Sequence, residues 1–203
     1  MTKETKFART KKEKLIFDAA LKIIKEKGFH QARMSDIAKE AGISYGLVYH
    51  YFKNKEDLFE TILNQWWGGL FDILEGLRNS RTDVREKLGK IVQYYLGTYH
   101  RYPELVTIFI TEISRSSTNL TPERLKKFMK LMSRTDAVMT EGQKGGLLRK
   151  DVKPRYLTYI FLGALETFIS AMVLVDQSLT KDSQVGRLGD AILDVFMNGA
   201  KSG

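Results

Sequence analysis

Apolar residues recur every three or four positions along almost the whole chain of 203 residues, and only three prolines interrupt this pattern. Such spacing places apolar side chains on one face of an α-helix, whereas strands require an alternation that is hard to find here. Hydrophobic residues make up 43% and charged residues 28%, which is usual for a soluble globular protein. The sequence therefore predicts an all-α fold.

Helix start and stop signals divide the pattern into about nine helices. Gly28 suits the end of the first helix, and Pro103, Pro122 and Pro154 each suit the first turn of a later one. The Gly68-Gly69 pair is a weak point inside the fourth helix. The expected ranges are 11–27, 34–41, 45–52, 55–79, 82–102, 103–115, 122–142, 154–176 and 182–198.

Several classes of site and location are excluded. The chain has no cysteine, so it has neither disulfides nor thiolate metal sites. No apolar segment that would suit a signal peptide follows the first lysines. The longest apolar run contains Glu166 and is short for a membrane span of about 20 residues. We therefore expect a cytoplasmic protein that does not enter a membrane.

Positive charge is concentrated at the amino-terminal end. Residues 1–55 hold 13 Lys/Arg against 6 Asp/Glu, whereas residues 56–203 hold 20 against 18. A solvated basic tail is one interpretation of this excess, and attraction to a polyanion is the other. The motif within this segment favours the second.

The segment 34–52 has the pattern of a helix-turn-helix. Ile37 and Ala38 lie on the apolar stripe of the first helix, Gly42 ends it, and Ser44 suits the N-cap of the next. This second helix is roughly 10–12 Å long, which matches the width of the DNA major groove. Val48 and Phe52 are expected to face the core together with Tyr51, whereas Tyr45, Tyr49 and His50 are expected to face away from it.

Two cations stand where the following helix begins. Lys53 and Lys55 lie at a helix N-terminus, where positive charge opposes the helix dipole. A bound phosphate would offset this repulsion, and a broken local rule of this kind often marks a functional site.

The stretch MSDIAKEAGISYGLVYHYFKNKEDLF resembles the DNA-binding signature of the TetR family of bacterial transcriptional regulators, and the likeness covers about residues 10–60. Arg33, Tyr45 and Leu47 depart from the common pattern of that family, so the operator sequence is not predicted; Leu47 is equally suited to a thymine methyl group and to the protein interior. The resemblance implies a helix-turn-helix DNA-binding domain over residues 1–55 and a ligand-binding and dimerisation domain over residues 56–203. The expected DNA-binding residues are Arg33, Ser35, Ser44, Tyr45, Gly46, Leu47, Tyr49, His50, Lys53 and Lys55.

The eighth expected helix is apolar nearly all round, so most of its faces must be buried. The resemblance implies that the last two helices pair with their copies in a twofold homodimer. The alternative is that this surface packs only within its own subunit. The expected interface residues are Phe161, Leu165, Met172, Leu188, Ile192 and Phe196.

The fifth to eighth helices combine aromatic residues and methionines with a few polar groups. Apolar walls with isolated polar groups are typical of a ligand pocket, and also of an ordinary core. The resemblance implies a pocket for a small effector, and the composition favours an apolar or aromatic ligand. The expected pocket residues are Tyr94, Tyr95, Tyr99, Phe109, Glu112, Phe128, Met129, Met132, Glu166 and Phe168.

Nothing in the sequence suggests an enzyme. His30, His50 and His100 lie far apart, and neither a nucleophile motif nor a phosphate-binding glycine loop is present. We expect no catalytic residue, no metal and no cofactor. The resulting hypothesis is a repressor that binds a palindromic operator as a dimer and is released by a small, largely apolar ligand. The rival hypothesis is a basic helical module that binds membrane surfaces or protein partners.

Overall fold

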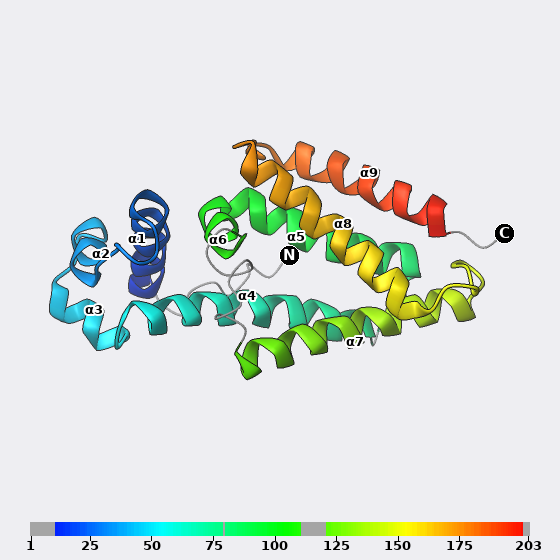
Figure 1. The fold of residues 1–203 in the computed structure, drawn as a ribbon, viewed down its shortest axis with the longest axis horizontal. Helices are drawn as coiled ribbons and strands as arrows, with labels where there is room; N and C mark the ends of the chain where they lie inside the picture. The colour runs from blue at the N-terminus through cyan, green and yellow to red at the C-terminus, as the bar shows by residue number, and fades with distance from the viewer. Residues whose placement is uncertain (1–10, 79, 111–120, 201–203) are drawn as a thin grey trace. The chain divides into compact units, whose positions relative to one another are not determined.

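A computed structural model describes residues 11–78, 80–110 and 121–200. These residues form nine helices and no β-strand (Figure 1), which confirms the expected all-α fold. The helices are α1 (Lys11–Lys27), α2 (Met34–Glu40), α3 (Tyr45–Tyr51), α4 (Lys55–Arg78), α5 (Val84–Arg101), α6 (Pro103–Ile108), α7 (Pro122–Lys144), α8 (Pro154–Leu174) and α9 (Asp182–Ala200).

The helix boundaries differ from the expected ones by a few residues. For example, α5 begins at Val84 rather than at residue 82, because the Asp83 side chain caps the helix by accepting a hydrogen bond from the Glu86 amide at 2.8 Å. The expected end of the sixth helix, at residue 115, lies outside the described residues.

The described residues fall into two compact units. One lies within Met1–Gly69 and Glu104–Arg115, and the other within Leu70–Pro103 and Ser116–Gly203. The boundary therefore falls within α4, directly after the Gly68-Gly69 pair. By packing, the first half of α4 belongs with α1–α3, whereas the sequence hypothesis placed a functional boundary at residue 55.

The core of the first unit lies where the apolar faces of α1, α2 and α3 meet. Ile16, Ile37 and Val48 contribute one fully buried side chain from each of these helices. The Phe52 ring, directly after α3, lies 5.6 Å from the Phe17 ring between centroids. Burial of these side chains fixes α3 on the other two helices and leaves its opposite face to solvent.

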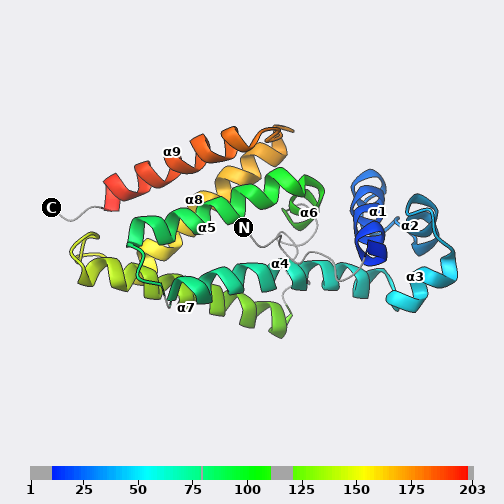
Figure 2. The same ribbon diagram turned by 180° about the vertical axis from the view of Figure 1, so that it is seen from behind.

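In the second unit α5 lies along α9 and α7 lies along α8 (Figures 1 and 2). Among the described helices, α8 alone is long and apolar enough to cross a membrane by length and composition. Here it packs within the unit, with Leu157, Phe161 and Leu165 buried.

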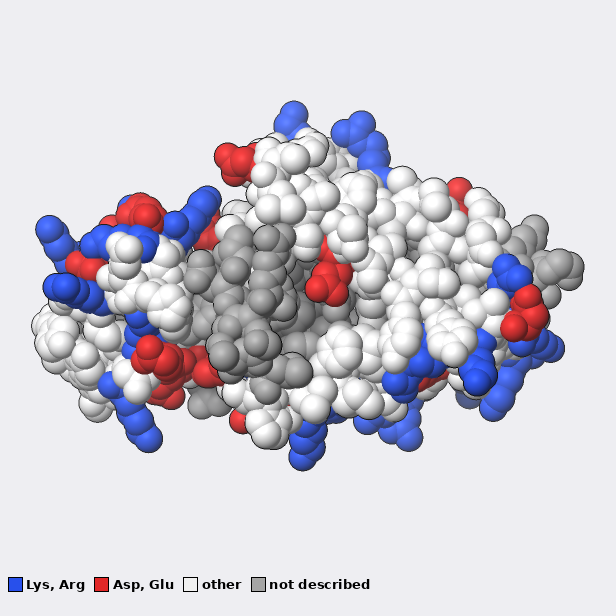
Figure 3. All heavy atoms as spheres, viewed as in Figure 1, with Lys and Arg blue, Asp and Glu red and all other residues white. Residues whose placement is uncertain are grey.

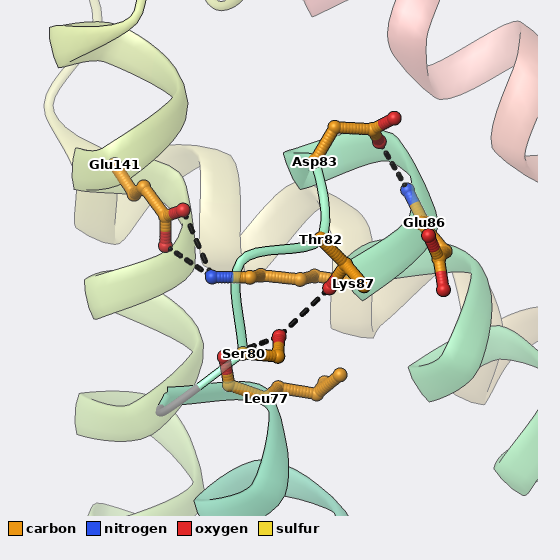
Figure 4. A network of polar contacts seen from close by, with 7 residues as sticks. All are labelled: Leu77, Ser80, Thr82, Asp83, Glu86, Lys87 and Glu141. Carbon is orange, nitrogen blue, oxygen red and sulfur yellow. Dashed lines mark hydrogen bonds and ion pairs between the residues drawn. The ribbon is translucent and has the colours of Figure 1, made fainter.

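A buried ion pair joins α5 to α7. The Lys87 side chain is only 2% exposed, and its Nζ lies 2.8 Å from each carboxylate oxygen of Glu141, which is 50% exposed (Figure 4). The nearby α4–α5 connection is closed by the Ser80 hydroxyl, which donates to the Leu77 carbonyl at 3.0 Å. This network fixes the start of α5 against the end of α7.

Candidate nucleic-acid interface

Helix α2 starts without a hydroxyl cap. Arg33 occupies the N-cap, and its amide donates to the Asp36 carboxylate at 3.4 Å. The same carboxylate pairs with Lys27 at 2.9 Å, and this hydrogen bond lowers the pKa of Asp36. Asp36 therefore supplies the side-chain hydrogen bond at the start of α2. The Arg33 and Ser35 side chains are both exposed.

The turn between α2 and α3 is set by Gly42 and Ser44. Gly42 has φ +65°, in the left-handed region that glycine adopts without strain. The Ser44 hydroxyl accepts a hydrogen bond from the Leu47 amide at 3.3 Å, which makes it the N-cap of α3, as the sequence predicts.

Helix α3 presents one face to solvent. Val48 is fully buried beneath it, Leu47 is half-buried, and Gly46 and His50 are exposed. Tyr45 and Tyr49 are 54% and 43% exposed. These exposures are consistent with the prediction that α3 offers an accessible polar and aromatic face.

The turn from α3 into α4 is held by a reciprocal cap. The Asp57 amide donates to Asn54 Oδ1 at 2.7 Å, and the Lys53 amide donates to Asp57 Oδ2 at 3.0 Å. The Lys53 side chain is exposed, and its ammonium has no hydrogen-bond or ion-pair partner among the described residues. This cation is free to contact an anion.

Lys55 differs from Lys53. Its ammonium donates to the carbonyl of Phe29, to that of His30 at 3.2 Å and to that of Ala32 at 3.1 Å. It also lies 4.6 Å from the centroid of the Phe29 ring. The sequence assigned Lys55 to DNA, but in this structure its donors are turned toward the protein.

An apolar groove of about 570 Å³ lies along α8 and α9 in the second unit. Figure 3 shows a broad, largely uncharged surface over these two helices. Ile160 and Val195 are 58% and 76% exposed there. The residues lining the groove include Ile160, Ala164, Phe168, Leu188, Ile192 and Val195.

The expected interface residues divide between the interior of the subunit and this groove. Phe161 and Leu165 have no exposed surface, and Met172 is 5% exposed, so these side chains support the face from within the subunit. Leu188, Ile192 and Phe196 do line the groove. Ile160, Ala164 and Val195 also line it, although the sequence did not single them out, because a helix that is apolar all round gives no signal for which face stays outside.

The expected effector residues are dispersed. Tyr94, Tyr99 and Met132 are buried in the second unit, but Phe128 and Met129 are 44% and 48% exposed on α7. Phe168 lines the α8–α9 groove. Phe109 lies in the first unit, 5.9 Å from the Trp66 ring, and Glu112 lies outside the described residues.

Three tyrosines of α5 have raised pKa values. Burial is the main cause for Tyr94, Tyr95 and Tyr99, and the negative charge of Glu166 adds to it at Tyr95. Like any tyrosine, they carry protonated hydroxyls at neutral pH, and the shift moves ionisation further from that range. Tyr99 already donates to the Gln177 carbonyl at 2.8 Å.

Two family models match the chain. Residues 16–62 match "Bacterial regulatory proteins, tetR family", and residues 81–170 match "Tetracyclin repressor-like, C-terminal domain". The fatty acid metabolism regulator protein of Bacillus subtilis (strain 168) is 26% identical over 187 residues, which are 91% of this chain and 93% of that protein.

Solved structures agree with these matches. The fatty acid degradation regulator FadR from Bacillus halodurans has a TM-score of 0.76 at 26% identity, covering 95% of this chain and 97% of that one. The ketosteroid regulator KstR2 of Mycobacterium tuberculosis has a TM-score of 0.78 at 18% identity, covering 97% of each chain, and shows the shared fold. These relatives are regulators, which confirms that the chain is not an enzyme. The chain therefore belongs to the TetR family of bacterial transcriptional regulators.

Proposed function

We propose that this chain is a cytoplasmic repressor that binds a pseudo-palindromic operator as a homodimer. The observation that carries the proposal is the solvent-facing side of α3, where Tyr45, Tyr49 and His50 are exposed together. A helix of this size fits the major groove, and hydroxyl and imidazole groups bond phosphates and base edges. Lys53 adds a cation that has no partner among the described residues, within a segment that carries most of the chain's excess positive charge.

The groove along α8 and α9 is the proposed dimer surface. It exposes Ile160 and Val195 on an apolar face, and such a face is costly to leave in water. A twofold partner offering the same surface would cover it. Two copies of α3 would then be available for two half-sites about one helical turn of DNA apart, roughly 34–36 Å. The proposal places DNA recognition in residues 1–55 and dimerisation and effector binding in residues 56–203.

The proposed effector is a long-chain acyl thioester such as an acyl-CoA. Support comes from the Bacillus subtilis and Bacillus halodurans relatives, which are named for fatty acid metabolism and fatty acid degradation. A Bacillus subtilis FadR of the same fold, at 24% identity over 92% of this chain with a TM-score of 0.72, was solved in complex with stearoyl-CoA. The apolar and aromatic side chains of α5, α7 and α8 suit an acyl chain.

A footprinting experiment tests the function. The wild-type protein should protect a short inverted repeat on fragments of its own genome, with affinity that falls steeply with salt. Stearoyl-CoA should then weaken this protection, whereas free CoA and stearate alone serve as controls for the two halves of the molecule. Equal binding to all DNA sequences, together with binding to anionic vesicles, would instead support the membrane-surface alternative.

A further inference from the structure

Lys55 and Lys53 stand two residues apart at the same turn, and their surroundings are opposite. The Lys53 ammonium is exposed and has no partner among the described residues. The Lys55 side chain is half-buried, and three backbone carbonyls accept from its ammonium. An ammonium has three N–H donors and no acceptor, so these carbonyls use all of its hydrogen-bonding capacity.

The carbonyls come from one short segment. Phe29, His30 and Ala32 follow the end of α1, where Gly28 has φ +78° and donates its amide to the Ile24 carbonyl at 2.8 Å. The carboxyl end of a helix carries partial negative charge, so a cation is favourable there. Moving the ammonium to a phosphate would remove the partner of each carbonyl and separate the charge from the Phe29 ring.

The hydrogen bonds of Lys55 join the two ends of the segment that contains α2 and α3. Ala32 leads directly into α2, α2 leads through Gly42 into α3, and Lys55 is the first residue of α4, only four residues after α3 ends. Lys55 thus links the start of α4, which follows the helix-turn-helix, to the turn between α1 and α2, which precedes it. The Phe29 ring adds a contact to Phe59 on α4, with centroids 5.4 Å apart.

We propose that Lys55 is a positioning residue, which holds α3 in its orientation through the α1–α2 turn and does not itself contact DNA. Lys53 is the cation of this turn that meets the phosphate backbone. This inference rests on the proposed DNA-binding function. Of the two lysines expected to contact DNA at this turn, it assigns Lys53 to a phosphate and Lys55 to the protein itself.

The salt dependence of DNA binding separates the two roles. Each phosphate contact contributes about 0.9 to the slope of log K against log salt, so one contact per subunit contributes about twice that in a dimer. The slope of log K against log salt should be shallower by this amount in the Lys53→Met variant. The Lys55→Met variant should bind a duplex selected by the wild-type protein roughly tenfold more weakly, with the wild-type slope, because it disturbs orientation and removes no phosphate contact.

A second variant guards against a fold defect in Lys55→Met. Phe29→Leu keeps every cation and removes only the ring beside the ammonium, so it should also weaken binding without changing the slope. A Lys55→Met slope reduced as much as that of Lys53→Met would overturn the inference, as would wild-type affinity in both Lys55→Met and Phe29→Leu.

Hydrogen exchange of the free protein gives a readout that does not depend on DNA. Lys55→Met should speed exchange of the amides of α2 and α3, whereas Lys53→Met should leave them unchanged. If the wild-type protein shows no sequence-specific DNA binding but this exchange difference appears, the proposed function fails and the positioning role stands. Unchanged exchange in Lys55→Met would overturn the positioning role.

Discussion

The hydroxyl of Tyr45 donates a hydrogen bond to the hydroxyl of Tyr49 at 3.1 Å, and their rings lie 4.8 Å apart between centroids. The two residues are one helical turn apart, so they meet on the exposed face of α3. The Tyr49 hydroxyl accepts this bond, so its own proton remains available to donate. The pair therefore offers DNA an oriented neutral donor.

The tyrosine pair should act as a unit in DNA binding. Tyr49→Phe removes the terminal donor and should weaken binding by about 1 kcal/mol, and Tyr45→Phe should have a smaller effect because it only orients that donor. The double variant should then be no weaker than Tyr49→Phe alone, a non-additivity that binding isotherms of all four proteins measure. Strictly additive losses would mean that the two hydroxyls contact DNA independently.

The groove along α8 and α9 should control the oligomeric state. Val195→Asp places a charge at a side chain that is 76% exposed in the subunit, so it should leave the fold intact and dissociate the dimer. Analytical ultracentrifugation measures this change. The matched control is Leu125→Asp on α7, which is 44% exposed and lies outside the groove. A dimer that survives Val195→Asp but not Leu125→Asp would place the interface elsewhere.

The helix-turn-helix was predictable because its signals are local. Gly42, Ser44 and Val48 fix a turn, a cap and a buried face within seven residues, and the structure has all three. The charge balance of residues 1–55 supports the same interpretation.

Long-range choices were not predictable from the same signals. Along α8 both Phe161 and Ile160 are large and apolar, yet the first has no exposed surface and the second is 58% exposed. The packing of α5, α7 and α9 against α8 decides between such neighbours. Similarly, the sequence shows two lysines at the start of α4, but the carbonyls that bind Lys55 lie 23 to 26 residues earlier in the chain.

Two glycines in long helices should respond oppositely to alanine. A Cβ at Gly68 in α4 would meet no atom within 4 Å, so Gly68→Ala should stabilise the protein by about 0.5–1 kcal/mol through helix propensity. A Cβ at Gly142 in α7 would lie 2.7 Å from Leu148 Cδ1 and 3.1 Å from Val84 Cγ1, so Gly142→Ala should destabilise it by about 1–3 kcal/mol. Denaturant unfolding of both variants checks the signs, and a destabilising Gly68→Ala would point to a bend in α4 that requires the glycine.

The Lys87–Glu141 ion pair should be asymmetric, because the two side chains differ in exposure. Glu141→Ala leaves the buried ammonium of Lys87, whose side chain is 2% exposed, without its counter-charge, and should cost about 3 kcal/mol or more of unfolding free energy. Lys87→Met fills the same space with an apolar side chain and leaves Glu141, already 50% exposed, to be hydrated, so the loss should stay within about 1 kcal/mol. Denaturant unfolding at neutral pH measures both losses, and the double variant should resemble Lys87→Met alone, since no buried charge remains in either. Equal losses in the two single variants would mean that water reaches Lys87 once Glu141 is removed, and that the start of α5 is less tightly fixed to α7 than the 2.8 Å contacts indicate.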